Sequence, residues 1–347
     1  GSGYANAAEI LSPDGSSVVW SHPADPGTTI ADFRTQTYRG KPVLTFWQGK
    51  GLGGLATGTD YIYDDHYRKI AEVHAGNGLS ADGHEFVITH RNTALVLAYT
   101  RSTADLTSIG GPADQAVING VVQEIDIRTG KVLLEWNSAD HVPYSESHQP
   151  LPASASTPWD WFHVNAVKLD KRGNLLIDAR NTWTAYDVNR RTGAVKWKLG
   201  GKNSSFTLRA ADGTRLNDAG DIFAWQHDAE DHGNGVFTVF DNESAGTANT
   251  GQNASNEYAS SRVTTVRLDT RHHTATLVKE YDEPTTSLAS SQGNAQVLRN
   301  GDVFTGWGSL NHLSEFSPSG AVVFDASYPA GYVSYRAYRL PWHPAAD

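Results

Sequence analysis

The chain has 347 residues, a formal net charge of −10 and no cysteine. The acidic balance argues against a nucleic-acid partner, because phosphate neutralisation needs clustered Lys and Arg side chains, and no apolar run is long enough for a helix that spans a membrane. The lack of cysteine excludes disulfides, thiolate nucleophiles and cysteine-based zinc sites.

Short β-rich runs separated by Gly, Asn, Asp and Pro predict an all-β fold. Several runs share a pattern in which an apolar strand is followed by an Asp-x-x-Thr-Gly or similar turn and then by a second apolar strand. Two examples turn at Thr129-Gly130 and at Thr192-Gly193. In chain order, the predicted strand pairs cover residues 10–20, 43–48, 61–73, 86–99, 121–136, 164–179, 184–197, 225–240, 262–281, 295–307, 313–324 and 333–342.

These strand pairs come in twos, and two hairpins per unit give four antiparallel strands. Repeating units of this kind predict a β-propeller, and counting the units gives six blades. The segment Ile10 to Trp20 echoes Glu315 to Phe324, so it is predicted to be an outer hairpin that lacks its inner partner. Val333 to Trp342 is predicted to be that inner hairpin. We therefore expect an all-β, six-bladed propeller whose last blade is closed by both termini, since closure pairs the open sheet edges.

No linker divides the chain, so we expect a single propeller domain over residues 1–347, with Gly1-Ser2-Gly3 as a remnant of cloning. This start is consistent with a secreted or extracellular protein whose signal peptide has been removed. The long irregular stretches are expected to be loops, which often carry function. They cover residues 49–60, 101–119, 137–160, 200–222 and 243–260.

Three histidines, His84, His163 and His227, each open a similar segment and are each followed by a turn and an apolar run. One histidine at the same phase of each repeat predicts that the three rings surround a shared channel. Asn165 lies two residues after His163 and is predicted to project to the same face of its strand. Arg180 ends the partner strand and would bring a planar, permanent positive charge suited to an oxyanion.

A metal site is the alternative interpretation of these histidines. Three histidines can hold zinc, but Arg180 would repel a cation, so an anion fits the group better. The acidic residues Asp228, Glu230 and Asp231 do not have the spacing of a calcium loop. We therefore predict no metal and no cofactor, with a structural Ca²⁺ as the less favoured alternative.

The motifs resemble the bacterial arylsulfotransferase family, whose members need no nucleotide sulfate donor. The likeness covers most of the chain and is closest to the short branch found in actinobacteria and fungi. Its most specific part is Trp161-Phe162-His163-Val164-Asn165, which lies within a matching segment that runs from Asp160 to Val167. The other matching segments are His84-Glu85-Phe86, Asp178-Ala179-Arg180, Gln226-His227-Asp228-Ala229 and Gly301-Asp302 to Glu315-Phe316.

The resemblance implies a six-bladed propeller and a ping-pong reaction in which a channel histidine takes the sulfuryl group from an aryl sulfate and passes it to a phenol. By motif order His227 matches the nucleophile. His84, His163, Asn165 and Arg180 match the residues that hold the sulfuryl oxygens and assist the phenol oxygen. Aryl sulfate and phenol are thus the expected small-molecule partners.

The chain departs from the family pattern at three places. Asn181 follows Arg180 where the family tends to have His, and Asp228 follows the predicted nucleophile, where it either orients the ring or caps a turn. A hydroxyl-bearing residue is expected late in the channel, in the region that holds Ser291, Gln292 and Asn294. We take His227, His84, His163 and Arg180 as catalytic candidates, and Asn165, Asn181, Asp228 and Asn294 as substrate-binding candidates.

These departures leave two other functions open. One is a non-catalytic propeller that binds a glycan, a peptide or an anionic small molecule. The other is a related enzyme that hydrolyses sulfate esters or acts on a specialised metabolite.

Overall fold

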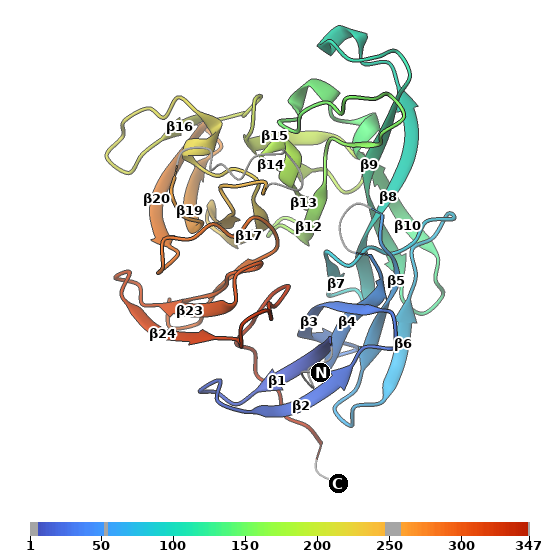
Figure 1. Ribbon diagram of the computed structural model, residues 1–347, viewed down its shortest axis with the longest axis vertical. Helices are drawn as coiled ribbons and strands as arrows, with labels where there is room; N and C mark the ends of the chain where they lie inside the picture. The colour runs from blue at the N-terminus through green and yellow to red at the C-terminus, as the bar shows by residue number, and fades with distance from the viewer. Residues whose placement is uncertain (1–5, 52–54, 247–257, 346–347) are drawn as a thin grey trace. The chain divides into compact units, whose positions relative to one another are not determined.

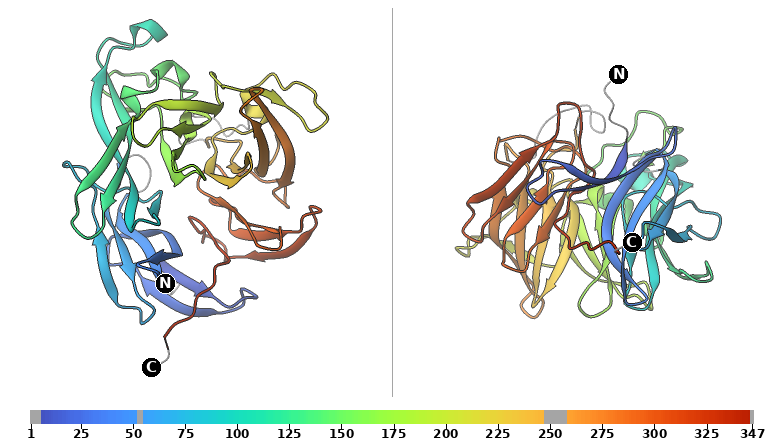
Figure 2. Two further views of the ribbon diagram at one scale, coloured as in Figure 1. Left: turned by 180° about the vertical axis from the view of Figure 1, so that it is seen from behind. Right: turned by 90° about the horizontal axis from the view of Figure 1, so that it is seen from below.

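The computed structural model describes residues 6–51, 55–246 and 258–345. The expected cloning remnant at residues 1–3 lies outside the described residues. Figures 1 and 2 show a chain built from strands and turns. In the described part, the helices are short 3₁₀ turns of three residues each: η1 (Thr107–Ile109), η2 (Ser138–Asp140), η3 (Tyr144–Glu146), η4 (Arg180–Thr182) and η5 (Ala219–Asp221).

The chain forms two compact units, which are described separately. Unit 1 takes in the described parts of Gly1–Thr100, Val121–Trp136 and Leu340–Asp347. Its strands are β1 (Ala7–Leu11), β2 (Val18–Pro23), β3 (Thr29–Tyr38), β4 (Lys41–Lys50), β5 (Thr57–Tyr63), β6 (Lys69–Val73), β7 (Phe86–Ile88), β8 (Thr93–Ala104), β9 (Gln115–Asp126) and β10 (Val132–Asn137), of which β8, β9 and β10 continue past the unit's bounds.

Unit 2 takes in the described parts of Arg101–Gly120 and Asn137–Arg339. Its strands are β11 (Trp159–Asp160), β12 (Val164–Leu169), β13 (Leu175–Ala179), β14 (Thr184–Val188), β15 (Val195–Gly200), β16 (Thr207–Arg209), β17 (His227–Gly233), β18 (Val236–Asp241), β19 (Arg262–Asp269), β20 (Thr274–Asp282), β21 (Asn294–Val297), β22 (Val303–Gly306), β23 (His312–Phe316) and β24 (Val322–Ser327).

The sheets have the strand order of propeller blades. In β3–β6, β12–β15 and β21–β24 each strand pairs with the next one along the chain. The β7–β10 and β17–β20 sheets have the same order, and each gains one short strand, β11 or β16, from a stretch predicted to be a loop. Four antiparallel strands in chain order are the blade of a propeller, so the all-β propeller prediction is confirmed at this level.

The predicted count of six blades is not confirmed. The described residues form five sheets of four or five strands, and β1 pairs with β2 alone. The predicted inner hairpin at 333–342 contains no strand. Instead, the Ala337 N–H donates to Asn294 Oδ1 at 2.8 Å and the Arg339 N–H donates to Gln296 Oε1 at 2.7 Å. Side-chain amides of β21 thus take the hydrogen bonds that a partner strand would need.

Both predicted Thr-Gly turns are confirmed. Asp126 Oδ1 accepts the Thr129 N–H at 2.8 Å, and Asn189 Oδ1 accepts the Thr192 N–H at 3.0 Å. Each turn closes on a glycine with positive φ, 71° at Gly130 and 73° at Gly193. Asp and Asn side chains favour such turns because they bond to the backbone a few residues on, and glycine takes positive φ without steric cost.

Within unit 2, β17 lies against β12 and β13 of one sheet and against β21 of another. Apolar side chains pack beneath it into one cluster: Leu176, Ala185, Leu199, Phe206, Leu208, Ile222, Phe223, Ala229, Phe237, Val239, Val266, Leu268, Ala275 and Leu277. Burial of this set fixes the start of β17, and therefore His227, on a rigid base.

Candidate active site

Each of the three predicted histidines lies at the start of an edge strand of its sheet. His227 is the first residue of β17, His163 directly precedes β12, and His84 lies two residues before β7. All three histidines therefore lie at or just before the first strand of their sheets, at offsets that differ by up to two residues. That the three rings surround a shared channel stays a prediction. His163 and His227 belong to unit 2, whereas His84 belongs to unit 1.

His227 is 2% exposed, and both of its ring nitrogens are hydrogen-bonded. Nδ1 lies 2.7 Å from Asn242 Oδ1. Nε2 lies 3.2 Å from the backbone N of Gln292, which donates to it. The carboxamide oxygen can only accept, so Nδ1 carries the ring proton and Nε2 carries the lone pair.

His163 is paired with a carboxylate. Its Nδ1 lies 2.5 Å from Asp160 Oδ2. The backbone O of Asp160 accepts from Asn181 Nδ2 at 2.5 Å, so the residue that departs from the family pattern supports the partner of His163. The carboxylate accepts the Nδ1 proton and so holds the orientation of the ring.

Arg180 is 2% exposed and lies beside both histidine segments. Its backbone N donates to the His163 O at 3.0 Å. Its guanidinium donates at 3.0 Å to Asn181 Oδ1, to the Ala245 O and to the Ser290 O. The guanidinium carbon also lies 5.2 Å from the ring centre of Trp225, a cation–π distance.

Asn165 and Asp178 support the segment before His227. Asn165 Nδ2 donates to the Gln226 O at 2.6 Å, while Asn165 Oδ1 is buried with no hydrogen-bond partner among the described residues. Asp178 accepts from Gln226 Nε2 at 2.6 Å and from the Ala229 N–H at 3.3 Å. Burial raises the pKa of Asp178 from 3.8 to about 7. The carboxyl group thus spans the two residues, His227 and Asp228, between its partners.

Asp228 and Asn294 mainly hold the framework around the site. Asp228 is 2% exposed, forms an ion pair with Lys168, and accepts the Ala295 N–H at 3.0 Å. Asn294 forms two hydrogen bonds with the backbone of Ala337, both at 2.8 Å. The amide of Asn294 is therefore engaged with the C-terminal segment.

Non-glycine residues with positive φ gather around these side chains. They are His163 (52°), Trp183 (53°), Trp225 (56°), Asp228 (58°) and Gln292 (64°). Such angles are uncommon for bulky residues, and strained backbone that the surrounding structure maintains is typical of functional sites.

The arylsulfotransferase (ASST) family model matches residues 34–329. The chain belongs to the arylsulfotransferase family. A solved protein of unknown function from Bacteroides caccae is 13% identical, with 94% of this chain and 92% of that chain covered and a TM-score of 0.50. Another of unknown function, from Dyadobacter fermentans, is 10% identical, with coverages of 90% and 86% and a TM-score of 0.48. At this identity the Bacteroides likeness supports the fold alone. No curated protein matches the chain.

The third histidine of this family member, His84, is 5% exposed and has its own carboxylate partner. Its Nδ1 is hydrogen-bonded to Asp82, which also accepts the His84 N–H at 3.0 Å. The Tyr99 ring lies 6.3 Å from the His84 ring, in an edge-on arrangement. His84 and His163 therefore share one design, a buried or half-buried imidazole held at Nδ1 by an Asp.

Sequence reasoning missed three residues that touch the predicted site. Asp160 and Asp178 lie inside the motifs that carry the family likeness, so their proximity to His163 and Arg180 in the chain was a usable signal. Asn242 lies 15 residues after His227, and only the pairing of β17 with β18 brings it back to the ring. Nothing in its local sequence marks it.

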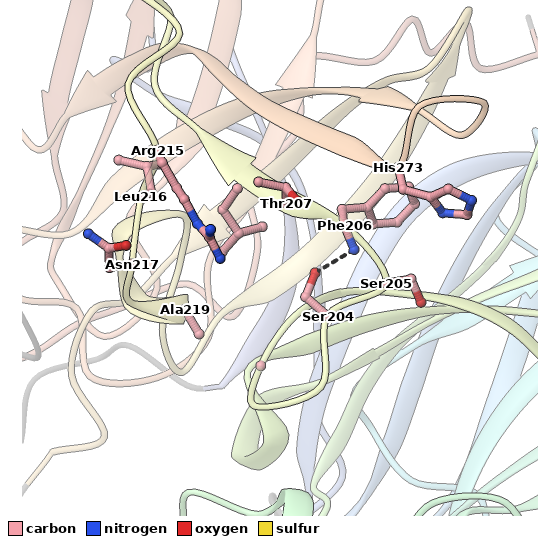
Figure 3. A pocket seen from close by; sticks show the side chains of 11 residues that line it. Ser204, Ser205, Phe206, Thr207, Arg215, Leu216, Asn217, Ala219 and His273 are labelled. Atoms are coloured by element: carbon pink, nitrogen blue, oxygen red, sulfur yellow. Dashed lines mark hydrogen bonds between the residues drawn. The ribbon is translucent and has the colours of Figure 1, made fainter.

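Other features of the described residues lie apart from this site. The one group of three candidate metal ligands found there, Asp64, Asp65 and His66, contains no predicted site residue. A surface cavity of about 380 Å³ is lined by Ser204, Thr207, Arg215 and His273 among others, and again by no predicted site residue (Figure 3). No helix within the described ranges is long and apolar enough to cross a membrane.

Proposed function

We propose that this arylsulfotransferase moves a sulfuryl group from an aryl sulfate to a phenol through a sulfohistidine at His227. The observation that carries the proposal is the hydrogen bonding of His227. Asn242 accepts the Nδ1 proton at 2.7 Å, so the reactive lone pair is on Nε2. The segment that contacts Nε2 through Gln292 also contacts the guanidinium of Arg180 through Ser290. A nucleophile and a positive charge thus meet at one segment.

In the first half of the reaction, the Nε2 lone pair forms a bond to sulfur while the ester S–O bond to the aryl group breaks. The bonding pair leaves on the phenolate oxygen, which takes a proton from the imidazolium of His163. Sulfuryl transfer resembles phosphoryl transfer in needing mainly positioning and charge stabilisation. Arg180 would stabilise the sulfuryl oxygens by about 2–4 kcal/mol, as an oxyanion-hole donor does.

In the second half, the oxygen of the acceptor phenol forms a bond to sulfur while the N–S bond breaks and returns the electron pair to Nε2. The phenol proton passes to the neutral imidazole of His163, which restores the starting state. The 2.5 Å contact with Asp160 supports this role, because a carboxylate stabilises the imidazolium. We propose His84, which has the same Asp arrangement, as a second acid–base group.

The remaining candidates have supporting roles in this proposal. Asn165 offers a buried carboxamide oxygen that has no partner among the described residues, so a substrate hydroxyl could donate to it. Asn181 connects Arg180 with Asp160. We propose that Asp228 and Asn294 act through the framework contacts that they make with Lys168 and Ala337.

The test is transfer from p-nitrophenyl sulfate to a phenol, followed by p-nitrophenol release and by the mass of the sulfated acceptor. We expect ping-pong kinetics in the wild type and no transfer by His227→Asn. A matched control is His232→Asn on the same strand, whose ring contacts Thr238 Oγ1 at 2.7 Å; it should retain transfer. Equal transfer by wild type and His227→Asn would show that His227 is not the nucleophile. Ligand stabilisation without turnover would favour a binding protein.

A further inference from the structure

Asn242 is the residue on which the contacts of His227 converge. It is fully buried and directly follows β18. Its neighbour Asp241 accepts the backbone N–H groups of Ala224 at 2.8 Å and Glu243 at 3.0 Å and forms an ion pair with Arg262 at 2.8 Å. These contacts hold the backbone at Asp241 and Glu243, so the position from which the Asn242 side chain projects is fixed.

The carboxamide of Asn242 can have only one orientation. Its Nδ2 donates to the backbone O of Ala289 at 2.6 Å and to the backbone O of Gln292 at 3.0 Å. Carbonyl oxygens only accept, so the NH₂ group must face them and Oδ1 must face the His227 ring. The proton of His227 is therefore on Nδ1, by hydrogen-bond chemistry alone.

The two carbonyls that Asn242 holds belong to a segment that we name the strap, residues Ala289 to Gly293. The strap has backbone φ angles of 64° at Gln292 and 103° at Gly293. It packs tightly on Gly308, where a Cβ atom would lie 2.4 Å from the Ser291 O. Its N–H at Gln292 meets Nε2 of His227 at 3.2 Å, and its Ser290 O accepts from Arg180 at 3.0 Å.

We propose that Asn242 is the positioning residue of this centre: it sets the Nδ1–H tautomer of His227 and clamps the strap, whose Gln292 N–H rests on Nε2 until substrate displaces it. The inference rests on the proposed function of His227 as nucleophile. The N–H lies on the lone pair that must reach sulfur, so the strap has to shift before the N–S bond forms. The same shift releases the Ser290 O from Arg180, which frees one guanidinium N–H for a sulfuryl oxygen.

The test reads the tautomer directly. Wild-type protein with ¹⁵N-labelled histidine is studied by two-bond ¹⁵N–¹H correlation, and the His227 signals are assigned by their loss in His227→Asn. We expect a protonated Nδ1 and an unprotonated Nε2. In Asn242→Ala the acceptor is gone, and we expect the proton to move to Nε2. Asn242→Asp keeps an acceptor for Nδ1–H but loses the two donors to the strap, so it should keep the wild-type tautomer.

Steady-state kinetics distinguish a changed His227 tautomer in Asn242→Ala from a general loss of stability. A wrong tautomer of a catalytic histidine lowers kcat by up to about 10⁴-fold, so Asn242→Ala should lose kcat with little change in KM, and Asn242→Asp should recover part of it. The matched control is Asn119→Ala. Asn119 is also buried, and it bridges Trp161 Nε1 at 3.0 Å and Ser102 Oγ at 2.9 Å away from His227; its loss should leave tautomer and kcat unchanged.

Three results would overturn the proposal: an Nε2–H tautomer in the wild type, an unchanged tautomer in Asn242→Ala, or equal losses of kcat in Asn242→Ala and Asn119→Ala. Failure of the proposed function is a different result. If the wild type transfers no sulfate but shows the Nδ1–H tautomer that Asn242→Ala shifts, the positioning role stands and the sulfotransfer assignment fails. If Asn242→Ala does not fold, the wild type and Asn242→Asp still decide the tautomer.

Discussion

Replacing Asp178 by Asn removes a buried titratable group from beneath the turn that carries His227. Asp178 is fully buried, and the two donors that it bonds to flank His227 and Asp228. Burial raises the pKa of Asp178 from 3.8 to about 7, partly offset by its hydrogen bonds with Gln226 and Ala229. An unfolded chain releases this proton near pH 4, whereas the native protein retains it until about pH 7.

Because the pKa of Asp178 is higher in the folded than in the unfolded chain, its protonation stabilises the folded protein. This contribution to the free energy of unfolding is complete below pH 3.8 and is lost as the pH rises to about 7. At 1.36 kcal/mol for each pH unit, the loss amounts to about 4 kcal/mol across the window. An Asn side chain does not titrate.

The assay is urea denaturation of the wild type and Asp178→Asn at several pH values from 4 to 8. The difference in the free energy of unfolding should shift in favour of the variant by about 4 kcal/mol between the two ends of that range. Other carboxyl groups with raised pKa values, such as Asp241, are present in both proteins and cancel in the difference. A difference that stays constant from pH 4 to pH 8 would show that the pKa of Asp178 is not raised in the folded protein.

Three further predictions test the site and its surroundings. Arg180→Lys keeps the charge but loses the guanidinium fork, so kcat for sulfate transfer should fall by about 10²–10³-fold; a loss of less than threefold would remove Arg180 from the reaction. Dialysis against EDTA should leave the transfer rate unchanged, because no step of the proposed reaction uses a metal. A loss of rate that added Ca²⁺ or Zn²⁺ reverses would contradict this. Burial lowers the pKa of His148, stacked on Trp183 at 3.6 Å, to about 4. The wild type should therefore lose about 2–3 kcal/mol relative to His148→Phe as pH falls from 6.5 to 4, and equal pH dependence of the two in denaturant titrations would count against it.

Local structure could be predicted from the sequence where particular residue types determine the backbone conformation, as in tight turns. The turns at Gly130 and Gly193 were predictable because Asp or Asn starts each turn and glycine ends it. The start of each histidine segment was predictable because an apolar strand follows a polar opening residue. The hairpin predicted at 333–342 was wrong because the apolar residues there do not reveal that Asn294 and Gln296 hold the segment through their side chains.

The sequence predicted the site residues that lie in family motifs, but it did not predict the residues that hydrogen-bond to them and hold them in place. His163 and Arg180 lie in family motifs, and the backbone ladder between β12 and β13 places them together. The 289–293 strap and Asn242 reach His227 only through tertiary packing, and no periodicity in the chain reports such contacts. Asp228 follows His227 in sequence, but its positive φ of 58° lets its carboxylate reach Lys168 and Ala295.

A covalent intermediate would leave a direct trace on the protein. The most direct measurement is mass spectrometry of the protein quenched at alkaline pH after brief exposure to an aryl sulfate without acceptor, followed by peptide mapping. One added SO₃ group is expected on the peptide that contains His227, lost on addition of a phenol and absent in His227→Asn. An SO₃ group on another residue, or turnover with no labelled peptide at any time, would contradict it.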